Sequence, residues 1–424
     1  MKASELIMKL ENGEFDGCLK KVYVTDEAVE AQKPRYIRTA KKFIEQFDDD
    51  RDVIVLSAPG RTEICGNHTD HNNGKVLAAS INLDAIAVAA KSDAAVINEK
   101  SEGHSLNVVD ISSLEPNADE YGRSGAMIKG VAARLNNLGY KIGGFDACTT
   151  SDVMGGSGLS SSAAFEVLIG NIISHLFNDG NIDAVEIAKA AQYSENVFFG
   201  KPSGLLDQMA SSVGTFVNID FEDTDKPIIK KIDFDFAGSG YSLCIVDTHG
   251  NHSDLTDDYA AVRGEMEAVA KAMGKNVLRE VSFENFKSQI GSLMEKTNDR
   301  AVLRAMHFFK ENERVDSAVQ ALENNCFEEF LKVITDSGRS SFMYNQNVFT
   351  PSAPLEQKLS VALCVTDDML PCGYRVHGGG FAGTIQAFVK NEELEAYRKA
   401  MDAIFGEGSC HVLIIRPVGG TRVI

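Results

Sequence analysis

The chain has 424 residues, 44% of them hydrophobic and 24% charged, which is the composition of a globular protein large enough for two domains. Its formal net charge of −19 argues against nucleic acids and anionic membranes as partners, because both are themselves negatively charged. If the substrate is a nucleotide, backbone amides, a helix terminus, a few cations or a metal ion must therefore reverse the field around it.

The first residues, MKASELIMKLENGEF, carry charges where a secretory signal peptide has an apolar region, and the sequence has no run of about 18 apolar residues. We therefore expect a cytoplasmic protein. The eight cysteines are scattered without a C-x-x-C pair, so the sequence favours reduced thiols over a zinc site or a disulfide framework.

Two β-type runs flank a polar segment in the first quarter of the chain. Residues 53–57 (VIVLS) predict a strand that ends in the turn signal Ala58-Pro59-Gly60, and residues 76–90 predict a second strand. The segment between them, RTEICGNHTDHNNG, is dense in Arg, Asn, His and Asp. We expect this segment to be a loop, and loops commonly carry binding sites.

Helical periodicity follows, and strands then alternate with helices. Apolar residues at i, i+3 and i+4 spacing predict helices over 126–138, 160–177 and 183–199, and β-type runs occur at 281–287 (VSFENFK) and 410–417 (CHVLIIRP). This alternation predicts a mixed α+β architecture. No Pro/Gly/Ser-rich linker separates the two halves, so any domain boundary is expected to be a packed hinge.

The segment GGSGLSSSAA (155–164) opens the helix predicted over 160–177. Its glycines allow successive N–H groups to converge, its serines can cap the first helical turn, and the helix dipole is positive at the same end. These features indicate a phosphate-binding loop. It is not a Walker A loop, because no Gly-Lys-Ser/Thr closes it. The alternative to a phosphate-binding loop is a Gly/Ser loop that precedes a capped helix and binds no ligand.

A second glycine-rich segment, HGGGFAG (377–383), formally matches G-x-G-x-x-G. A dinucleotide-binding loop must open a helix, whereas the residues that follow, TIQAFV, alternate as a strand does. We interpret the segment as a turn that lets the backbone approach a ligand closely, with a purely structural tight turn as the alternative.

Asp207, in the segment SGLLDQ, is a candidate catalytic carboxylate. It lies among apolar neighbours, where an unpaired carboxylate is costly. Near a phosphate-binding loop it could accept a proton from a substrate hydroxyl. Taken alone, a solvated Asp at the start of a helix also explains the residue and is the commoner case.

The polar loop carries groups suited to a sugar. Asn67, His68 and Asp70 combine hydrogen-bond donors and acceptors, which each buried hydroxyl of a polyhydroxylated ligand requires. Arg61 is permanently charged and suits a developing phosphate. His68 and His71 have H-x-x-H spacing, but no third soft ligand is near them in the sequence, which argues against zinc.

Together and in this order, three segments resemble the GHMP kinase superfamily, and the galactokinase family in particular. APGRTEICGNHTDHNNGKVL resembles the galactokinase signature, GGSGLSSSAA the ATP-phosphate motif, and GGGFAG the third motif of the superfamily. They span residues 58–383, and three motifs in register are specific where any one of them is weak. Mevalonate and homoserine kinases share the phosphate motif but not the loop from Arg61 to Gly74, which favours a sugar substrate.

The resemblance implies an α+β fold of two lobes with the active site in the cleft between them. Residues 1–215 are expected to form an N-terminal sugar- and ATP-binding lobe of the ribosomal-protein-like β-α-β kind, and residues 216–424 a ferredoxin-like C-terminal lobe. The implied reaction is phosphorylation of galactose by ATP at the anomeric C1 hydroxyl, giving galactose 1-phosphate and ADP. We expect a monomer or weak homodimer without nucleic-acid or membrane partners.

The resemblance also implies roles for individual residues. Asp207 would abstract or orient the C1 hydroxyl proton, and Arg61 would keep Asp207 ionised and stabilise charge on the transferred phosphate. Ser162 and Glu195 would bind Mg²⁺ bridging the ATP phosphates, since Mg²⁺ prefers oxygen ligands. The ATP phosphates would be held by Gly155, Gly156, Ser157, Gly158, Leu159, Ser160, Ser161 and Ser162, and the sugar by Asn67, His68, Asp70, Asp207, Tyr259 and Gly379.

Asn67 departs from the family pattern. The usual loop reads GEHTDYN, whereas this one reads GNHTDHN, so an amide replaces a glutamate expected near the C6 hydroxyl of the sugar. An amide still accepts a hydrogen bond and would also tolerate a negatively charged C6 substituent. Galacturonate or another hexose modified at C6 is therefore an alternative substrate. An alternative of a different class is a non-catalytic sensor of galactose and ATP, but such chains tend to lose the catalytic carboxylate or the serine-rich loop, and this sequence keeps both.

Overall fold

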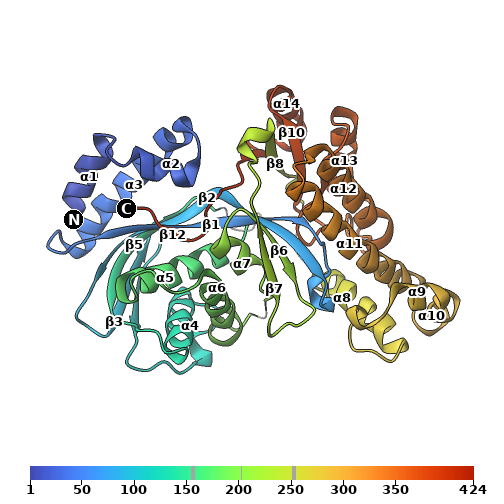
Figure 1. Ribbon diagram of the computed structural model, residues 1–424, viewed down its shortest axis with the longest axis horizontal. Helices are drawn as coiled ribbons and strands as arrows, with labels where there is room; N and C mark the ends of the chain where they lie inside the picture. Colours follow the sequence, from blue (N-terminus) through green and yellow to red (C-terminus); the bar gives the residue numbers. More distant parts are fainter. Residues whose placement is uncertain (154–157, 202, 251–254) are drawn as a thin grey trace. The chain divides into compact units, whose positions relative to one another are not determined.

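The computed structural model describes residues 1–153, 158–201, 203–250 and 255–424 (Figure 1). Gly155, Gly156 and Ser157, which were expected to hold phosphate, lie outside the described residues. The chain divides into two compact units. Unit 1 comprises Met1–Arg61, Ser80–Thr215 and Arg416–Ile424, and unit 2 comprises Thr62–Ala79 and Phe216–Ile415. Each unit takes residues from both halves of the chain, and the lobes 1–215 and 216–424 stay a prediction.

Unit 1 contains a mixed sheet with the strand order β12-β1-β2-β5-β3-β4. β3 runs parallel to β5, whereas the pairs β12–β1, β2–β5 and β3–β4 are antiparallel. β1 and β2 also contribute residues to unit 2. The strands are β1 (Ile54–Cys65), β2 (Lys75–Lys91), β3 (Val96–Ser101), β4 (Leu106–Asp110), β5 (Phe145–Ser151) and β12 (Thr421–Arg422).

Helices cover both faces of the unit 1 sheet. Figure 1 shows α1, α2 and α3 on one side of these strands and α4, α5 and α6 on the other. The helices are α1 (Ala3–Glu11), α2 (Asp16–Tyr23), α3 (Asp26–Phe47), α4 (Ser124–Asn137), α5 (Ser161–Phe177), α6 (Ala184–Tyr193) and α7 (Leu206–Val213), with the short turn η2 (Ala118–Glu120) and the π-helix η3 (Ser194–Phe199). The three helices predicted from periodicity are confirmed, with the last one ending as η3.

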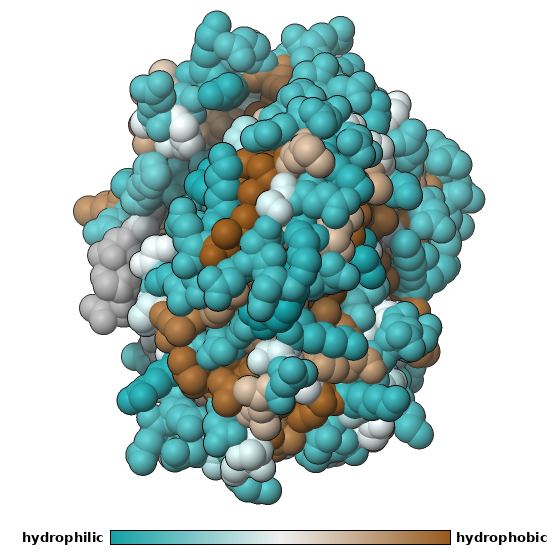
Figure 2. All heavy atoms as spheres, turned by 90° about the vertical axis from the view of Figure 1, so that its left-hand side faces the viewer, coloured by the Kyte–Doolittle hydropathy of each residue, from teal (hydrophilic) through white to brown (hydrophobic). Residues whose placement is uncertain are grey.

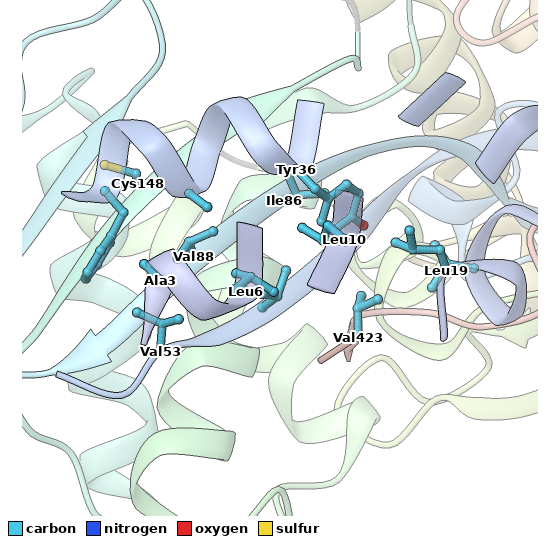
Figure 3. Close-up of a cluster of buried hydrophobic side chains, with 14 of the residues drawn as sticks. Ala3, Leu6, Leu10, Leu19, Tyr36, Val53, Ile86, Val88, Cys148 and Val423 are labelled. Carbon is cyan, nitrogen blue, oxygen red and sulfur yellow. The ribbon is translucent and has the colours of Figure 1, made fainter. Parts of the chain in front are cut away.

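The N-terminal helices pack on the sheet through a buried apolar cluster. Leu6 of α1 and Tyr36 of α3 meet Val53, Ile86 and Val88 from the strand side, and all five are at most 4% exposed (Figure 3). Burying such side chains supplies the main driving force for docking these helices. The outer surface is different: hydrophilic residues cover most of the face in Figure 2, and apolar residues form smaller areas between them.

Unit 2 contains an antiparallel sheet with the order β11-β8-β10-β9. In addition, β6 pairs with the first residues of β2, and β7 pairs with β6. Its strands are β6 (Phe216–Asp220), β7 (Ile228–Ile232), β8 (Tyr241–Asp247), β9 (Tyr374–Val376), β10 (Thr384–Lys390) and β11 (Cys410–Leu413). Its helices are α8 (Thr256–Ala272), α9 (Phe283–Ser288), α10 (Ile290–Lys296), α11 (Asp299–Glu323), α12 (Phe327–Ser340), α13 (Lys358–Met369) and α14 (Leu394–Phe405), the π-helix η6 (Ser341–Asn345), and the short turns η1 (Asp70–Asn72), η4 (Ala237–Ser239) and η5 (Leu278–Glu280).

Three local predictions are wrong. The predicted turn at Ala58-Pro59-Gly60 is part of β1, because Gly60 serves close packing: a Cβ on it would lie 2.8 Å from the Leu159 carbonyl oxygen. The loop predicted at 61–74 is wrong over its first five residues, 61–65, which also belong to β1, because Thr62 and Ile64 alternate into the buried side as strand residues do. The predicted strand at 281–287 is largely α9, because the Ser282 hydroxyl caps the helix by accepting from the Asn285 N–H at 3.2 Å. The strand predicted after HGGGFAG is confirmed as β10, and the glycine-rich segment connects β9 to β10.

Among the helices of the described ranges, none combines the length and the apolar character needed to cross a membrane.

Candidate active site

Three of the predicted site residues meet in unit 1, where Arg61 and Ser160 both contact Asp207. Arg61 lies on β1, and Asp207 lies in the first turn of α7. Arg61 Nε donates to Asp207 Oδ1 at 2.6 Å, and the Ser160 hydroxyl donates to Asp207 Oδ2. The Asp207 side chain remains 35% exposed. Both carboxylate oxygens therefore have a protein donor while the group stays accessible to a ligand.

The residues before α5 bind Arg61 through their backbone. Gly158 and Ser160 have φ angles of 73° and 60°, in the left-handed region that reverses the chain direction. Arg61 donates from Nη1 to the Gly158 carbonyl and from its own N–H to the Leu159 carbonyl at 3.0 Å. Leu159 itself is fully buried. Arg61 thus joins the carboxylate of Asp207 to the start of α5.

The N-terminus of α5 begins without a side-chain cap. We expected a serine cap, but the hydroxyl of Ser160, the N-cap residue, binds Asp207 and makes no cap hydrogen bond. Ser161 and Ser162 follow in the first turn, which contains no acidic residue. Because the first N–H groups of a helix lack intrahelical acceptors and the dipole is positive there, this helix end is suited to bind an anion such as a phosphate.

Ser162 and Glu195, the predicted metal ligands, also lie close together. The Ser162 hydroxyl is 3.5 Å from Glu195 Oε1. Glu195 lies on the π-helix η3 with its side chain 3% exposed, and it forms an ion pair of 2.9 Å with Lys201. Its second oxygen accepts from Gln208 Nε2 at 2.9 Å. The pair therefore offers a hydroxyl and a carboxylate oxygen beside the start of α5.

Glu166, one turn after Ser162 on α5, is a neighbour that sequence reasoning missed. It is fully buried and accepts a weak hydrogen bond from Gln208 Nε2 at 3.4 Å. Burial, reinforced by the negative charge of Glu195, raises the pKa of Glu166 to about 9, so this side chain is neutral at pH 7. The sequence does indicate that Glu166 is unusual, because it is the single charged residue of the apolar helical segment AAFEVLIG.

Asn67 anchors the polar loop in unit 2. Its Nδ2 donates to Glu63 Oε1 at 2.9 Å and to the Gly378 carbonyl at 2.7 Å. Its Oδ1 accepts from Asn347 Nδ2 at 2.8 Å. The residue is 1% exposed, so the amide that replaces the family glutamate is already engaged by protein groups.

His68, Tyr259 and Gly379, predicted sugar contacts, are brought together in unit 2. His68 Nε2 donates to the Gly379 carbonyl at 2.8 Å, and the Tyr259 hydroxyl donates to the Gly380 carbonyl at 3.0 Å. A larger residue at 379 would have to displace Tyr259, because a Cβ there would lie 2.5 Å from the Tyr259 ring. The ring also packs edge-on against Phe381, with centroids 5.4 Å apart. Two side chains from distant segments therefore hold the glycine-rich turn.

Asp70, the remaining predicted sugar contact, begins the turn η1 (Asp70–Asn72) of the polar loop and is half-buried. His71, in the same turn, is half-buried, and burial together with the neighbouring His68 lowers its pKa to about 3. Within the described part of the chain, no group of three or more His, Cys, Asp and Glu is arranged to hold a metal ion.

Glu311 and His307 of α11 support the polar loop and were also missed. Glu311 Oε1 accepts from the Gly66 N–H at 3.0 Å, and His307 Nε2 donates to the Asn67 carbonyl at 2.9 Å. Both side chains are fully buried. Burial opposes ionisation of Glu311, but the positive charges of Arg314 and Arg375 and the other neighbouring groups, Ser337 among them, together outweigh it and hold the pKa of Glu311 below its ordinary value. The sequence indicates these two residues only weakly, as polar residues at i and i+4 that share one face of a helix.

Each unit thus offers a distinct chemistry. In unit 1, a carboxylate bound by an arginine and a serine next to an anion-binding helix end is suited to accept a proton from a hydroxyl and to stabilise a phosphate. In unit 2, imidazole, phenol and backbone groups around a glycine-rich turn are suited to hydrogen-bond a polyhydroxylated ligand.

Comparisons with known proteins agree with this chemistry. The galactokinase galactose-binding signature matches residues 41–91, and the GHMP kinases N terminal domain matches residues 126–215. The galactokinase of Streptomyces coelicolor is 31% identical over 353 residues, which cover 83% of this chain and 88% of that protein. The chain belongs to the galactokinase family of GHMP kinases. A second family member, the galactokinase of Thermotoga petrophila, is 30% identical over 84% of this chain and 97% of its own length.

Solved structures of GHMP kinases have the same fold. The crystal structure of Lactococcus lactis galactokinase complexed with galactose matches 90% of this chain and 98% of that chain with a TM-score of 0.76 and 26% identity. A mevalonate kinase structure matches 85% of this chain and 97% of that chain with a TM-score of 0.58 and 16% identity. The predicted α+β GHMP kinase fold and the predicted class, a galactokinase-type sugar kinase, are confirmed. As a GHMP kinase the protein uses ATP, and the roles of its single residues stay predictions.

Proposed function

We propose that the chain transfers the terminal phosphoryl group of ATP to the C1 hydroxyl of galactose. The observation that carries this proposal is the contact of Asp207 with both Arg61 and Ser160 at the start of α5. The galactose-binding signature over residues 41–91 supports galactose as the acceptor sugar. A carboxylate next to an anion-binding helix end is the combination that phosphoryl transfer to a hydroxyl requires.

In the proposed reaction the C1 oxygen forms a bond to the γ-phosphorus, and the bond from that phosphorus to the bridging oxygen of ADP breaks. Asp207 accepts or orients the proton of the C1 hydroxyl. Its orientation is fixed by donors on both oxygens, Arg61 on Oδ1 and Ser160 on Oδ2. Arg61 adds a permanent positive charge beside the phosphate that gains negative charge in the transition state.

Ser162 and Glu195 are the proposed ligands of Mg²⁺. Their oxygen atoms, 3.5 Å apart, fit an ion that takes one or two protein oxygens and completes its shell with water and phosphate oxygens. When bound, Mg²⁺ would neutralise charge on the ATP phosphates. Lys201 pairs with Glu195 at 2.9 Å and supplies a second cation at this position.

The proposed sugar contacts are His68, Asp70, Tyr259 and Gly379. His68 and Tyr259 already hydrogen-bond the glycine-rich turn, so the polar atoms that remain for a ligand are held in fixed positions. We assign Asn67 to holding the polar loop, because its amide donates to Glu63 and Gly378. An amide engaged in this way gives a C6 carboxylate no particular advantage, and this favours galactose over galacturonate.

A coupled assay of ADP release with galactose, galacturonate, arabinose and N-acetylgalactosamine tests the proposal. We expect the highest kcat/KM with galactose. If ADP is released with galacturonate but not with galactose, the substrate is the C6-modified sugar and the proposal of galactose is wrong. If none of the four sugars causes ADP release, the protein is not a sugar kinase of this specificity.

The Asp207→Ala variant separates catalysis from binding. We expect turnover to fall by about 10²-fold or more, because the proton acceptor is lost, while calorimetry still detects galactose binding. Normal turnover in this variant would show that Asp207 does not take part in the reaction.

A further inference from the structure

Arg35 of α3 joins two carboxylates from different strands of unit 1. Its Nη1 forms an ion pair of 2.6 Å with Asp152, which follows β5, and its Nη2 forms an ion pair with Asp84 on β2. Nη1 also donates to the Asp84 carbonyl at 3.2 Å. The Arg35 side chain is only 5% exposed, so its guanidinium interacts with these two carboxylates and little with solvent. Arg35 precedes residues 41–91 and 126–215, the segments that match the family signatures.

The Asp84 end of the bridge is a rigid anchor. Asp84 is fully buried, and its Oδ2 accepts from the Tyr23 hydroxyl at 2.8 Å and pairs with Arg416 at 3.1 Å. Burial opposes ionisation, but the charges of Arg35 and Arg416 outweigh it and hold the pKa of Asp84 below its ordinary value. A buried carboxylate bound on all sides is costly to move.

The Asp152 end is partly exposed and bound by three groups. Its side chain is 36% exposed, and besides the Arg35 ion pair it accepts from Gln32 Nε2 at 3.1 Å. Its backbone N–H donates to the Asp84 carbonyl at 3.0 Å. Asp84 of β2 therefore holds the backbone of Asp152, and Arg35 and Gln32 of α3 hold its side chain.

Asp152 connects this anchor to the proposed catalytic cluster. The next residue, Val153, packs on Gly60: a Cβ on Gly60 would lie 3.0 Å from Val153 Cγ1 and 2.8 Å from the Leu159 carbonyl oxygen. Gly60 directly precedes Arg61, whose N–H donates to that same carbonyl at 3.0 Å. A displacement of Asp152 would therefore be transmitted through Val153 to the strand position that carries Arg61.

We propose that Asp152, held by Arg35 and Gln32, is a positioning residue that sets the place of Arg61 and the start of α5 relative to the nucleotide phosphates. This inference rests on the proposed kinase function. A direct effect of the Asp152 charge would have the opposite sign, since a carboxylate repels the phosphates of ATP. If charge alone mattered, removing the Asp152 carboxylate would strengthen ATP binding. If the position of Arg61 and α5 matters, removing it would weaken ATP binding.

The Asp152→Ala variant tests this, with Glu102→Ala as the matched control. Glu102 also links α3 to β5: it pairs with Lys42 at 2.7 Å and accepts from the Thr150 hydroxyl at 2.7 Å. Its side chain is 32% exposed, close to the 36% of Asp152. Both variants therefore lose one negative charge and two contacts with α3, those of Asp152 with Arg35 and Gln32 or those of Glu102 with Lys42 and Arg38. Only Asp152 adjoins the residue that packs on Gly60.

For Asp152→Ala we expect the ATP KM, and the ATP dissociation constant measured without sugar, to rise about fivefold or more, because small displacements at a phosphate site weaken binding strongly. The galactose KM should stay within about twofold, and Glu102→Ala should leave all three constants unchanged. Gln32→Ala, which removes only a neutral donor, should raise the ATP constants in the same direction by a smaller factor. It also keeps the test possible should Asp152→Ala fold poorly.

An unchanged or tighter ATP dissociation constant in Asp152→Ala would overturn the proposal. Equal increases of the ATP dissociation constant in Asp152→Ala and Glu102→Ala would overturn it as well, since they would show that any contact that docks α3 on the sheet has the same effect. Because the dissociation constant is measured without sugar, it decides the matter even if galactose is not the acceptor.

Discussion

Arg61 Nε lies 2.6 Å from Asp207 Oδ1, and the same guanidinium donates to the carbonyl of Gly158 at the start of α5. One arginine therefore orients the proposed proton acceptor and binds the segment that is expected to hold phosphate. Such a double role depends on the fork of donors in a guanidinium, which a lysine lacks.

The Arg61→Lys variant should lower kcat by about 10²-fold, because lysine keeps the charge but cannot bind Asp207 and Gly158 in the same geometry. Steady-state kinetics with galactose and ATP measure the effect. Arg51→Lys is the control, since Arg51 pairs with Asp146 at 2.6 Å elsewhere in unit 1. A kcat in Arg61→Lys equal to that of Arg51→Lys would speak against the double role.

The Gly379→Ala variant should raise the galactose KM by about tenfold. The added Cβ would lie 2.5 Å from the Tyr259 ring and must displace it from the glycine-rich turn. Gly378→Ala is the control, because at φ 65° it suffers backbone strain but meets nothing within 4 Å. If both variants raise the galactose KM equally, strain in the turn and not the position of Tyr259 is responsible.

The Glu166→Gln variant should be more stable than the wild type at pH 7. The folded pKa of Glu166 is raised to about 9, so its stabilising contribution is full below the unfolded value of 4.5 and is lost as pH rises toward 9. Glutamine removes this loss and should gain about 1–3 kcal/mol at pH 7, and almost nothing at pH 4.5. Denaturant unfolding at the two pH values measures the difference.

Glu102→Gln supplies a control of opposite sign for that experiment. A hydrogen bond from Lys42, followed by one from Thr150, lowers the pKa of Glu102 to about 2. Its contribution is present above the unfolded pKa and is lost on acidification, so Glu102→Gln should be neutral or destabilising at pH 7. Stabilisation by both substitutions would show that the effect is not specific to burial of Glu166.

His307 should make unit 2 sensitive to acid. Burial lowers the pKa of His307 to about 4, so as pH falls from 6.5 to 4 the unfolded state binds a proton that the folded state does not. The wild type should therefore lose up to about 3 kcal/mol of stability over this interval from this residue. His307→Gln keeps a donor for the Asn67 carbonyl and should show a smaller loss, which thermal midpoints at pH 7 and 4.5 detect.

Much of the fold follows from local patterns in the sequence. The helices α4, α5 and α6 have strong periodicity over at least two turns, and β2 is a long apolar run, so both kinds of element were predicted close to their observed bounds. The turn predicted at Ala58-Pro59-Gly60 failed for a non-local reason. Whether glycine serves a turn or a close approach depends on Leu159, about a hundred positions away, and no local pattern contains that information.

The site residues divide in the same way. Arg61, Asp207 and Ser160 were identified by motif and do meet in the structure. No motif marks the supporting residues: Glu311 and His307 lie on α11, and Asn347 follows η6. Their contacts with the polar loop depend on tertiary packing. Sequence therefore indicates which groups do the chemistry better than which groups hold them in place.

Phosphorus NMR of the product formed from galactose and ATP tests the proposed reaction most directly. We expect one new phosphomonoester signal that couples to the anomeric proton, formed in a one-to-one ratio with ADP and absent with Asp207→Ala. ADP and free phosphate without a sugar phosphate, or a phosphate attached to any carbon other than C1, would contradict the proposed transfer to the anomeric hydroxyl.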